Sequence, residues 1–112
     1  MTPTQEWIDQ KKKEHGKVFK TTINNEVVFF RTIKRNEHLG IQKDVFPNGT
    51  PGDVTTVTPE DNARLENRIV EKCLLWPENV KVEDLDAGFP PMLTAMIMQY
   101  SGFGAATEPE AV

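Results

Sequence analysis

The chain has 112 residues, of which 38% are apolar and 27% charged, and its length predicts one globular domain over residues 1–112. The net charge of −4 argues against nucleic-acid binding, which needs clustered lysine and arginine, and the single cysteine, Cys73, excludes an internal disulfide or a cysteine-rich zinc site. Neither an apolar signal segment nor an apolar run near the roughly 20 residues of a membrane span is present, so we expect a protein that does not enter a membrane.

The first predicted element is a helix within residues 1–16. Thr2 suits the N-cap, a proline follows it, and Gln5 lies three residues later, as in a capping box. Gly16 is a natural helix end. Because Trp7 and Ile8 form only a small apolar patch, we expect this helix to be loosely docked.

A β-hairpin is predicted for residues 17–35. Asn24 and Asn25 separate two runs of β-branched and aromatic residues, and asparagine tolerates the positive φ angles of a type I′ turn. This loop pairs Ile23 with Glu26, Thr21 with Val28 and Phe19 with Phe30. Both faces of the hairpin are then partly apolar. A lone hairpin is marginal in water, so we expect it to be covered on more than one side or to meet a partner.

Residues 36–103 are predicted to be mainly helical. Asn36 is the expected cap of a short helix, EHLGIQKD, with Leu39 and Ile41 facing inward. The segment FPNGTPGD that follows contains two prolines and two glycines and is predicted to be a mobile loop.

Two longer helices are predicted after this loop. The first has Thr58 as its cap and ends at Pro77, and the second begins at Pro90 and closes at Gly102. Apolar residues recur along both at helical spacing, and the expected core is Leu65, Ile69, Cys73, Leu74, Leu93, Ile97 and Tyr100. The linker between them has no helical period, and residues 104–112 are expected to be a flexible acidic tail.

These elements predict an α+β fold, in which an antiparallel β-hairpin packs against three to four short helices. No catalytic constellation is apparent in the sequence. His15 and His38 stand in no metal-ligand spacing, and Cys73 lies in an apolar helical stripe, where a thiol behaves as a small hydrophobe. The acidic linker residues lack the ligand order of a calcium loop, and the glycines match no phosphate-binding motif. We therefore expect no enzyme activity, metal, cofactor or small-molecule substrate.

The last helix is rich in methionine, which fills gaps in cores and also serves surfaces that bind apolar partners. Met92 and Met96 lie on or beside the stripe of Leu93 and Ile97, whereas Met98 lies off it. The helix therefore has apolar character on two sides and needs a second contact surface, within the fold or on another chain.

Several short motifs follow one another between residues 18 and 103. They are Phe30-Arg31 at the end of a strand, Arg35-x-Glu37 at a helix start, Cys73-Leu74-Leu75-Trp76-Pro77 at a helix end, Ala87-Gly88-x-Pro90 opening the last helix, and Ser101-Gly102-Phe103. In this order they resemble the small tail assembly chaperone family of tailed bacteriophages and related accessory proteins of tail and baseplate construction.

The resemblance implies a non-enzymatic protein without a cofactor. Such chaperones bind the tape measure protein, or the tail tube protein, in the host bacterial cytoplasm before the tail polymerises. The candidate contact residues are apolar and lie on the hairpin and around the last helix: Phe19, Phe29, Met92, Met96, Met98 and Phe103.

Two other functions are compatible with the sequence. One is a structural subunit of the phage tail or baseplate, which would be found in the virion. The other is a small acidic regulator that inhibits a host enzyme. A hairpin that is apolar on both faces is also compatible with a homo-oligomer.

Overall fold

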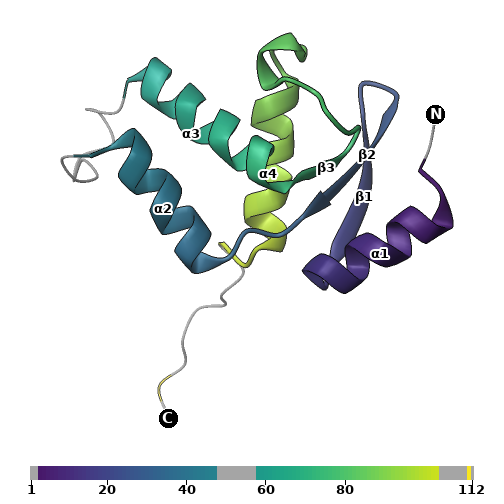
Figure 1. The fold of residues 1–112 in the computed structure, drawn as a ribbon. Coiled ribbons are helices and arrows are strands. Elements are labelled where there is room, and N and C mark those ends of the chain that lie inside the picture. The colour runs from purple at the N-terminus through teal and green to yellow at the C-terminus, as the bar shows by residue number, and fades with distance from the viewer. Residues whose placement is uncertain (1–2, 48–57, 104–110, 112) are drawn as a thin grey trace.

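The computed structural model of the chain describes residues 3–47, 58–103 and 111 (Figure 1). Its elements in chain order are α1 (Gln5–His15), β1 (Val18–Ile23), β2 (Glu26–Arg31), α2 (Arg35–Val45), α3 (Pro59–Cys73), β3 (Leu74–Trp76), the 3₁₀ helix η2 (Val82–Asp84) and α4 (Phe89–Tyr100). The fold is α+β, as predicted. Figure 1 shows α2, α3 and α4 grouped together, with the hairpin and α1 beside them.

The predicted hairpin is confirmed in its turn and its register. Asn24 and Asn25 have φ angles of 52° and 65°, which are those of the two-residue turn. The Cα partners include Ile23 with Glu26, Thr21 with Val28 and Phe19 with Phe30.

A third strand, β3, was not predicted. The sequence indicated one continuous helix up to Pro77, but α3 ends at Cys73 and the next three residues pair antiparallel with β2. Phe29 lies opposite Trp76 and Phe30 opposite Leu74, so the strand order is β1-β2-β3. The apolar spacing of the helix continues through Leu74, which masked the change to extended backbone.

The two faces of the hairpin are covered by different elements, as predicted. On one face, Ile23, Val28 and Phe30 belong to the main core, together with residues of α2, α3 and α4. On the other face, Phe29 is 5% exposed, its ring lies against Trp7, and Trp76 is its partner on β3. The hairpin is therefore an inner layer between the helices and α1.

Helix α1 begins two residues later than predicted and docks chiefly through Trp7. Thr4, rather than Thr2, is the N-cap, and its Oγ1 accepts a hydrogen bond from the Trp7 amide at 3.2 Å; Thr2 lies outside the described residues. The Trp7 ring meets Phe29 and Trp76 edge-on at 5.7 and 5.5 Å. No residue of α1 is fully buried, so this aromatic contact is its main attachment.

Replacing Trp7 with alanine is expected to release α1 and expose Phe29. Burial of one large apolar side chain contributes about 2 kcal/mol, so urea denaturation should show a loss of this size. Hydrogen exchange of the α1 amides should become faster, while exchange in α3 and α4 stays slow. Lys12→Ala, on the exposed surface of the same helix, is the control. Unchanged protection of α1 in Trp7→Ala would show that another contact holds the helix.

Helix α2 differs from its prediction at two residues. The predicted cap, Asn36, lies inside the helix, which begins at Arg35 with Lys34 as its N-cap. Of the two residues expected to face inward, Ile41 is 6% exposed, whereas Leu39 is 48% exposed. Ile41 and Val45 are spaced by four residues and form the buried side of the helix, and this places Leu39 on the opposite side.

The long helices supply most of the core, as predicted. Thr58 caps α3, and Gly102, with a φ of 98°, follows the end of α4. Ile69, Cys73, Leu93 and Ile97 are buried, while Leu65 and Leu74 are partly buried against them. Tyr100 was expected in the core but is 54% exposed. It is the last residue of α4, and its ring lies against Phe19 and Phe30 of the hairpin while the rest of the side chain faces solvent.

Two predicted flexible segments are largely untested by the structure. Of the predicted mobile loop FPNGTPGD, only Phe46 and Pro47 are among the described residues, and of the predicted acidic tail only Ala111 is. Within the described part of the chain, no helix has the length and apolar character needed to cross a membrane.

Candidate protein-binding surfaces

The six candidate contact residues occupy three kinds of environment. Phe29 is buried under α1 and is not available to a partner in this conformation, whereas Met98 is partly buried against the core. Phe19 and Met96 are partly buried and line one groove. Met92, 41% exposed, lies in the first turn of α4, and Phe103, 47% exposed, lies just after the end of this helix.

The first surface is a groove between β1 and the C-terminal half of α4. We call it the aromatic groove; it has a volume of about 260 Å³ and is lined by Phe19, Lys20, Thr21, Phe30, Met96, Gln99 and Tyr100. The Phe19 ring stacks on Phe30 at 5.5 Å and lies 4.8 Å from Tyr100. These contacts hold the three aromatic rings together, while the flexible Met96 side chain lines the groove from the same helix as Tyr100.

The second surface lies between α2 and the residues after α4. We call it the Leu39–Phe103 surface; its groove of about 280 Å³ is lined by Ile33, Arg35, His38, Leu39, Ser101, Gly102 and Phe103. The His38 and Phe103 rings are 5.0 Å apart, and partial burial lowers the pKa of His38. A neighbouring groove shares Leu39 and extends along α2 to Phe46 and Pro47.

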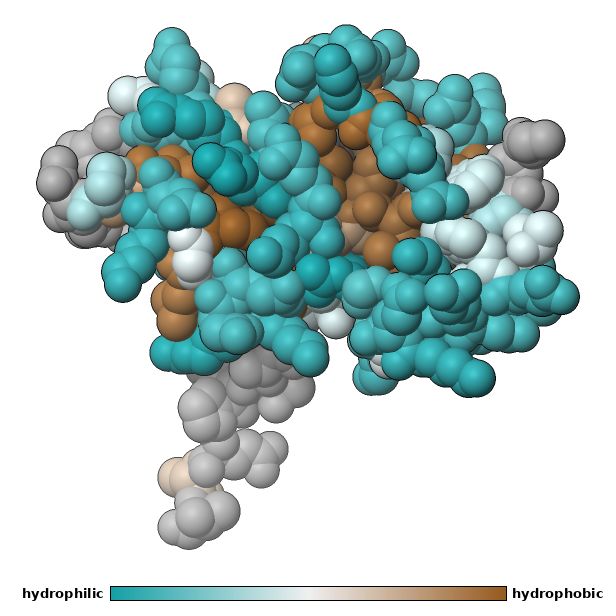
Figure 2. Space-filling model, in the orientation of Figure 1, coloured by the Kyte–Doolittle hydropathy of each residue, from teal (hydrophilic) through white to brown (hydrophobic). Residues whose placement is uncertain are grey.

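Figure 2 shows how apolar side chains reach the face that it views. Brown surface is visible over α2, and a second brown area lies over the region of β3; hydrophilic side chains frame both. Beside β3 the chain also forms a cleft whose apolar lining includes Leu74, Leu75, Pro77 and Val80. These four side chains are only partly exposed, whereas Leu39 on α2 is about half exposed.

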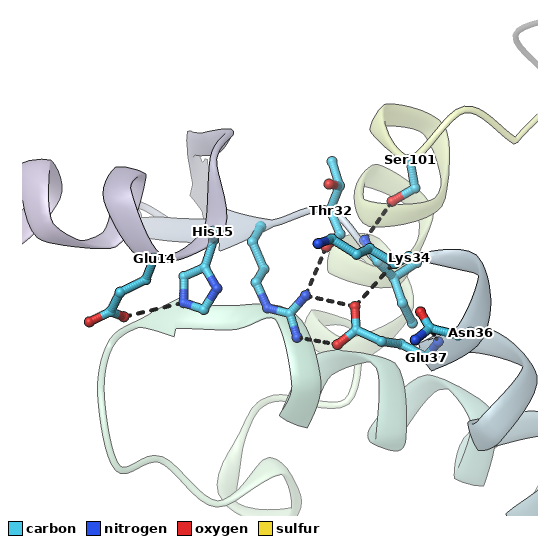
Figure 3. Close-up of polar contacts among 9 residues, drawn as sticks. Glu14, His15, Thr32, Lys34, Asn36, Glu37 and Ser101 are labelled. Carbon is cyan, nitrogen blue, oxygen red and sulfur yellow. Dashed lines mark hydrogen bonds and ion pairs between the residues drawn. The ribbon is translucent and has the colours of Figure 1, made fainter.

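Hydrogen bonds of Arg31, Glu37 and Ser101 connect the elements that border the Leu39–Phe103 surface, and we call this cluster the polar junction (Figure 3). The Arg31 guanidinium donates two hydrogen bonds to the Glu37 carboxylate, at 2.9 and 2.8 Å, and a third to the Thr32 carbonyl at 3.1 Å. Glu37 also accepts from the Lys34 amide at 3.1 Å, which caps α2. The Arg31 contact lowers the pKa of Glu37 to about 2, below its usual range. A bidentate, charge-assisted ion pair therefore connects the end of β2 to the first turn of α2.

Ser101 joins the end of α4 to the same junction. Its Oγ accepts a hydrogen bond from the Ile33 amide at 2.9 Å (Figure 3). The same hydroxyl donates a hydrogen bond to the Ile97 carbonyl. The segment between β2 and α2 is thus fixed to the C-terminus of α4, next to Phe103. Residues from three of the motifs behind the family resemblance, Arg31, Glu37 and Ser101, meet here.

Of the side chains that could carry chemistry, Cys73 and His15 do not line either surface, while His38 does. Cys73 is fully buried, and burial raises the pKa of its thiol to about 11, which disfavours the reactive thiolate. His15 lies 3.5 Å from Glu14, and partial burial lowers the pKa of its imidazole (Figure 3). Across residues 3–47 and 58–103, no group of three or more histidine, cysteine or acidic side chains is arranged to hold a metal ion.

Sequence reasoning missed two residues of these surfaces. Leu39 and Tyr100 were both assigned to the interior because they continue an apolar helical pattern. For Leu39, the sequence pattern that predicts exposure lies in its neighbours. Ile41 and Val45 are four residues apart and form the buried side of α2, and Leu39 is not on that side. For Tyr100, the glycine two residues later marks the helix end, where side chains are commonly half exposed.

Comparisons of this chain with models of protein families, with curated proteins and with solved structures found no match.

Proposed function

We propose that this protein is a non-enzymatic tail assembly chaperone of a tailed bacteriophage. It covers apolar segments of the tape measure protein, or of the tail tube protein, in the host cytoplasm before the tail polymerises. The family resemblance supplies the identity of the client. The observation that carries the binding role is the pair of open apolar surfaces on either side of the C-terminal end of α4.

The exposed side chains support binding rather than self-packing. Leu39, Tyr100 and Phe103 are each about half exposed, and all three line or border these two surfaces. Grouped exposed apolar side chains mark interaction sites more often than isolated ones do. The grooves are small, which suits a client bound reversibly and released at assembly rather than a permanent subunit interface.

The charge of the chain supports the same role. At −4, the protein keeps a complex with an apolar client soluble by mutual repulsion. The Leu39–Phe103 surface is an exception within this acidic chain, because the ionisable groups that line it are Arg35 and His38.

Affinity purification from infected cells tests the proposal. The tagged full chain is expressed in host cells infected by the phage that encodes it, and its partners are identified by mass spectrometry alongside purified virions. Recovery of the tape measure or tail tube protein, with this chain absent from virions, is the expected result. Its presence in virions at a fixed copy number would make it a structural subunit. Recovery of a host enzyme alone would make it a host-directed regulator.

A double variant, Leu39→Ser with Phe103→Ser, tests which surface the client uses. We expect it to lower client recovery about tenfold or more, because two exposed apolar anchors are lost. Met92→Ser is the matched control: Met92 is 41% exposed but lies near the other end of α4, away from both surfaces. Loss of recovery in Met92→Ser, with full recovery in the double variant, would place the contact at the N-terminal end of α4.

A further inference from the structure

The outer edge of β1 is an open strand next to the aromatic groove. In the sheet order β1-β2-β3, β1 pairs on one side only. In a hairpin closed by the Ile23–Glu26 pair, the backbone groups of Lys20 and Thr22 point away from β2. No other backbone hydrogen bond from the described residues reaches these two residues, and both are exposed. The edge therefore presents donors and acceptors at strand spacing.

The groove beside this edge supplies apolar contacts at the same place. Phe19, Lys20 and Thr21 of β1 line one side of the aromatic groove, and Met96, Gln99 and Tyr100 of α4 line the other. An added strand would bond to the β1 backbone, and its side chains on the α4 side would enter the groove. Backbone bonds give such complexes their affinity, and side-chain pockets give them specificity.

Charge indicates what kind of strand fits. Residues 11–23 contain five lysines and one glutamate, although the whole chain carries a net charge of −4. The β1 segment itself, with Lys17 before it, contains no acidic residue. A complementary partner strand is therefore acidic as well as apolar.

The same lysines argue against a second copy of this chain. Antiparallel pairing of two β1 strands about Lys20 sets the lysines of both copies opposite each other, and like charges in that position destabilise the pair. Lysine on an edge strand is a common device against such self-association.

We propose that the β1 edge and the aromatic groove bind an extended, acidic and apolar segment of a partner protein as a fourth strand of the sheet. This inference rests on the proposed function only for the source of that segment, which is then part of the client.

Hydrogen exchange of the ¹⁵N-labelled full chain tests the proposal with two synthetic seven-residue peptides. One alternates valine and glutamate, and the other alternates valine and lysine. The glutamate peptide is expected to slow exchange at the Lys20 and Thr22 amides about tenfold or more. The amides of Phe19 and Thr21 already belong to the hairpin ladder and should change little, so they serve as internal controls. The lysine peptide should have no effect.

Two exposed lysines give a matched pair of charge-reversal variants. Lys20→Glu is expected to weaken binding of the glutamate peptide about tenfold and to permit binding of the lysine peptide. Lys81→Glu makes the same change before η2 and should behave as the wild type. The proposal is wrong if millimolar glutamate peptide leaves the Lys20 and Thr22 amides unprotected, or if protection appears only at the Leu39–Phe103 surface. It is also wrong if a twelve-residue thymidine oligonucleotide, and not the peptide, protects them.

The outcomes separate this inference from the proposed function. Peptide binding at β1, combined with affinity purification that recovers no tail protein, would keep the edge site and remove the chaperone role. Recovery of a tail protein that is unchanged in Lys20→Glu, together with a negative peptide result, would keep the chaperone role and remove the edge site.

Discussion

Replacing Leu93 with alanine is expected to lower the free energy of unfolding by roughly 3–5 kcal/mol. Leu93 is fully buried, and removal of a buried leucine loses its transfer free energy and leaves a cavity that the fold only partly fills. A domain of this size has a total stability of about 5–15 kcal/mol, so the variant should be partly unfolded at 37 °C. Urea denaturation followed by circular dichroism measures the loss.

Leu39→Ala provides the matched control because it makes the same substitution at a leucine that is 48% exposed. It should change the free energy of unfolding by about 0.5 kcal/mol or less. Equal losses in the two variants would contradict the assignment of Leu93 to the core and of Leu39 to the surface.

The second large effect is expected at the polar junction. Glu37→Gln should lower the free energy of unfolding at pH 7 by about 1.5–3 kcal/mol, the range for hydrogen bonds to a charged group. The variant keeps the shape of the side chain but removes the charge that Arg31 faces across 2.8 Å. Glu83→Gln, at an exposed carboxylate of η2, is the control and should cost about 0.5 kcal/mol or less.

The effect of Glu37 should depend on pH in a defined direction. Its carboxyl has a pKa of about 2 in the folded chain against an ordinary value of 4.5, chiefly because Arg31 donates hydrogen bonds to it. A carboxyl with a lowered pKa stabilises the fold above its unfolded value and loses that contribution as pH falls toward the folded value. The stability difference between the wild type and Glu37→Gln should therefore shrink between about pH 5 and pH 2. A difference that stays constant over this range would show that the ion pair contributes little.

The sequence was sufficient to predict the hairpin because its signals are local. Two adjacent asparagines with β-branched and aromatic neighbours determine both the turn and the register. The same holds for the start of α3, where Thr58 and Pro59 act within one helical turn. The apolar spacing of Ile69, Cys73, Leu93 and Ile97 also predicted the main core correctly.

The remaining features depend on contacts between distant segments. The strand β3 has three residues and exists because Phe29 and Phe30 offer a partner edge, which no local pattern reveals. Ser101 bonds to Ile33 across 68 positions of sequence, so the junction that fixes the Leu39–Phe103 surface could not be predicted from either segment alone.

The candidate site was predicted in part. Phe19 and Met96 do line one groove, but Phe29, another of the candidate contact residues, is buried under α1. Trp7, in a helix expected to be loosely docked, covers Phe29. The sequence identified apolar residues that could contact a partner. Which of them face solvent depends on the packing of distant segments.

The most direct test of the central claim is whether the full chain keeps a purified tape measure protein from aggregating. Light scattering is followed while the tape measure protein of the same phage is diluted from denaturant with increasing amounts of this chain. We expect scattering to fall to the baseline near stoichiometric ratios with the wild type and to persist with Leu39→Ser, Phe103→Ser. Equal scattering with and without the wild-type chain would contradict the chaperone role.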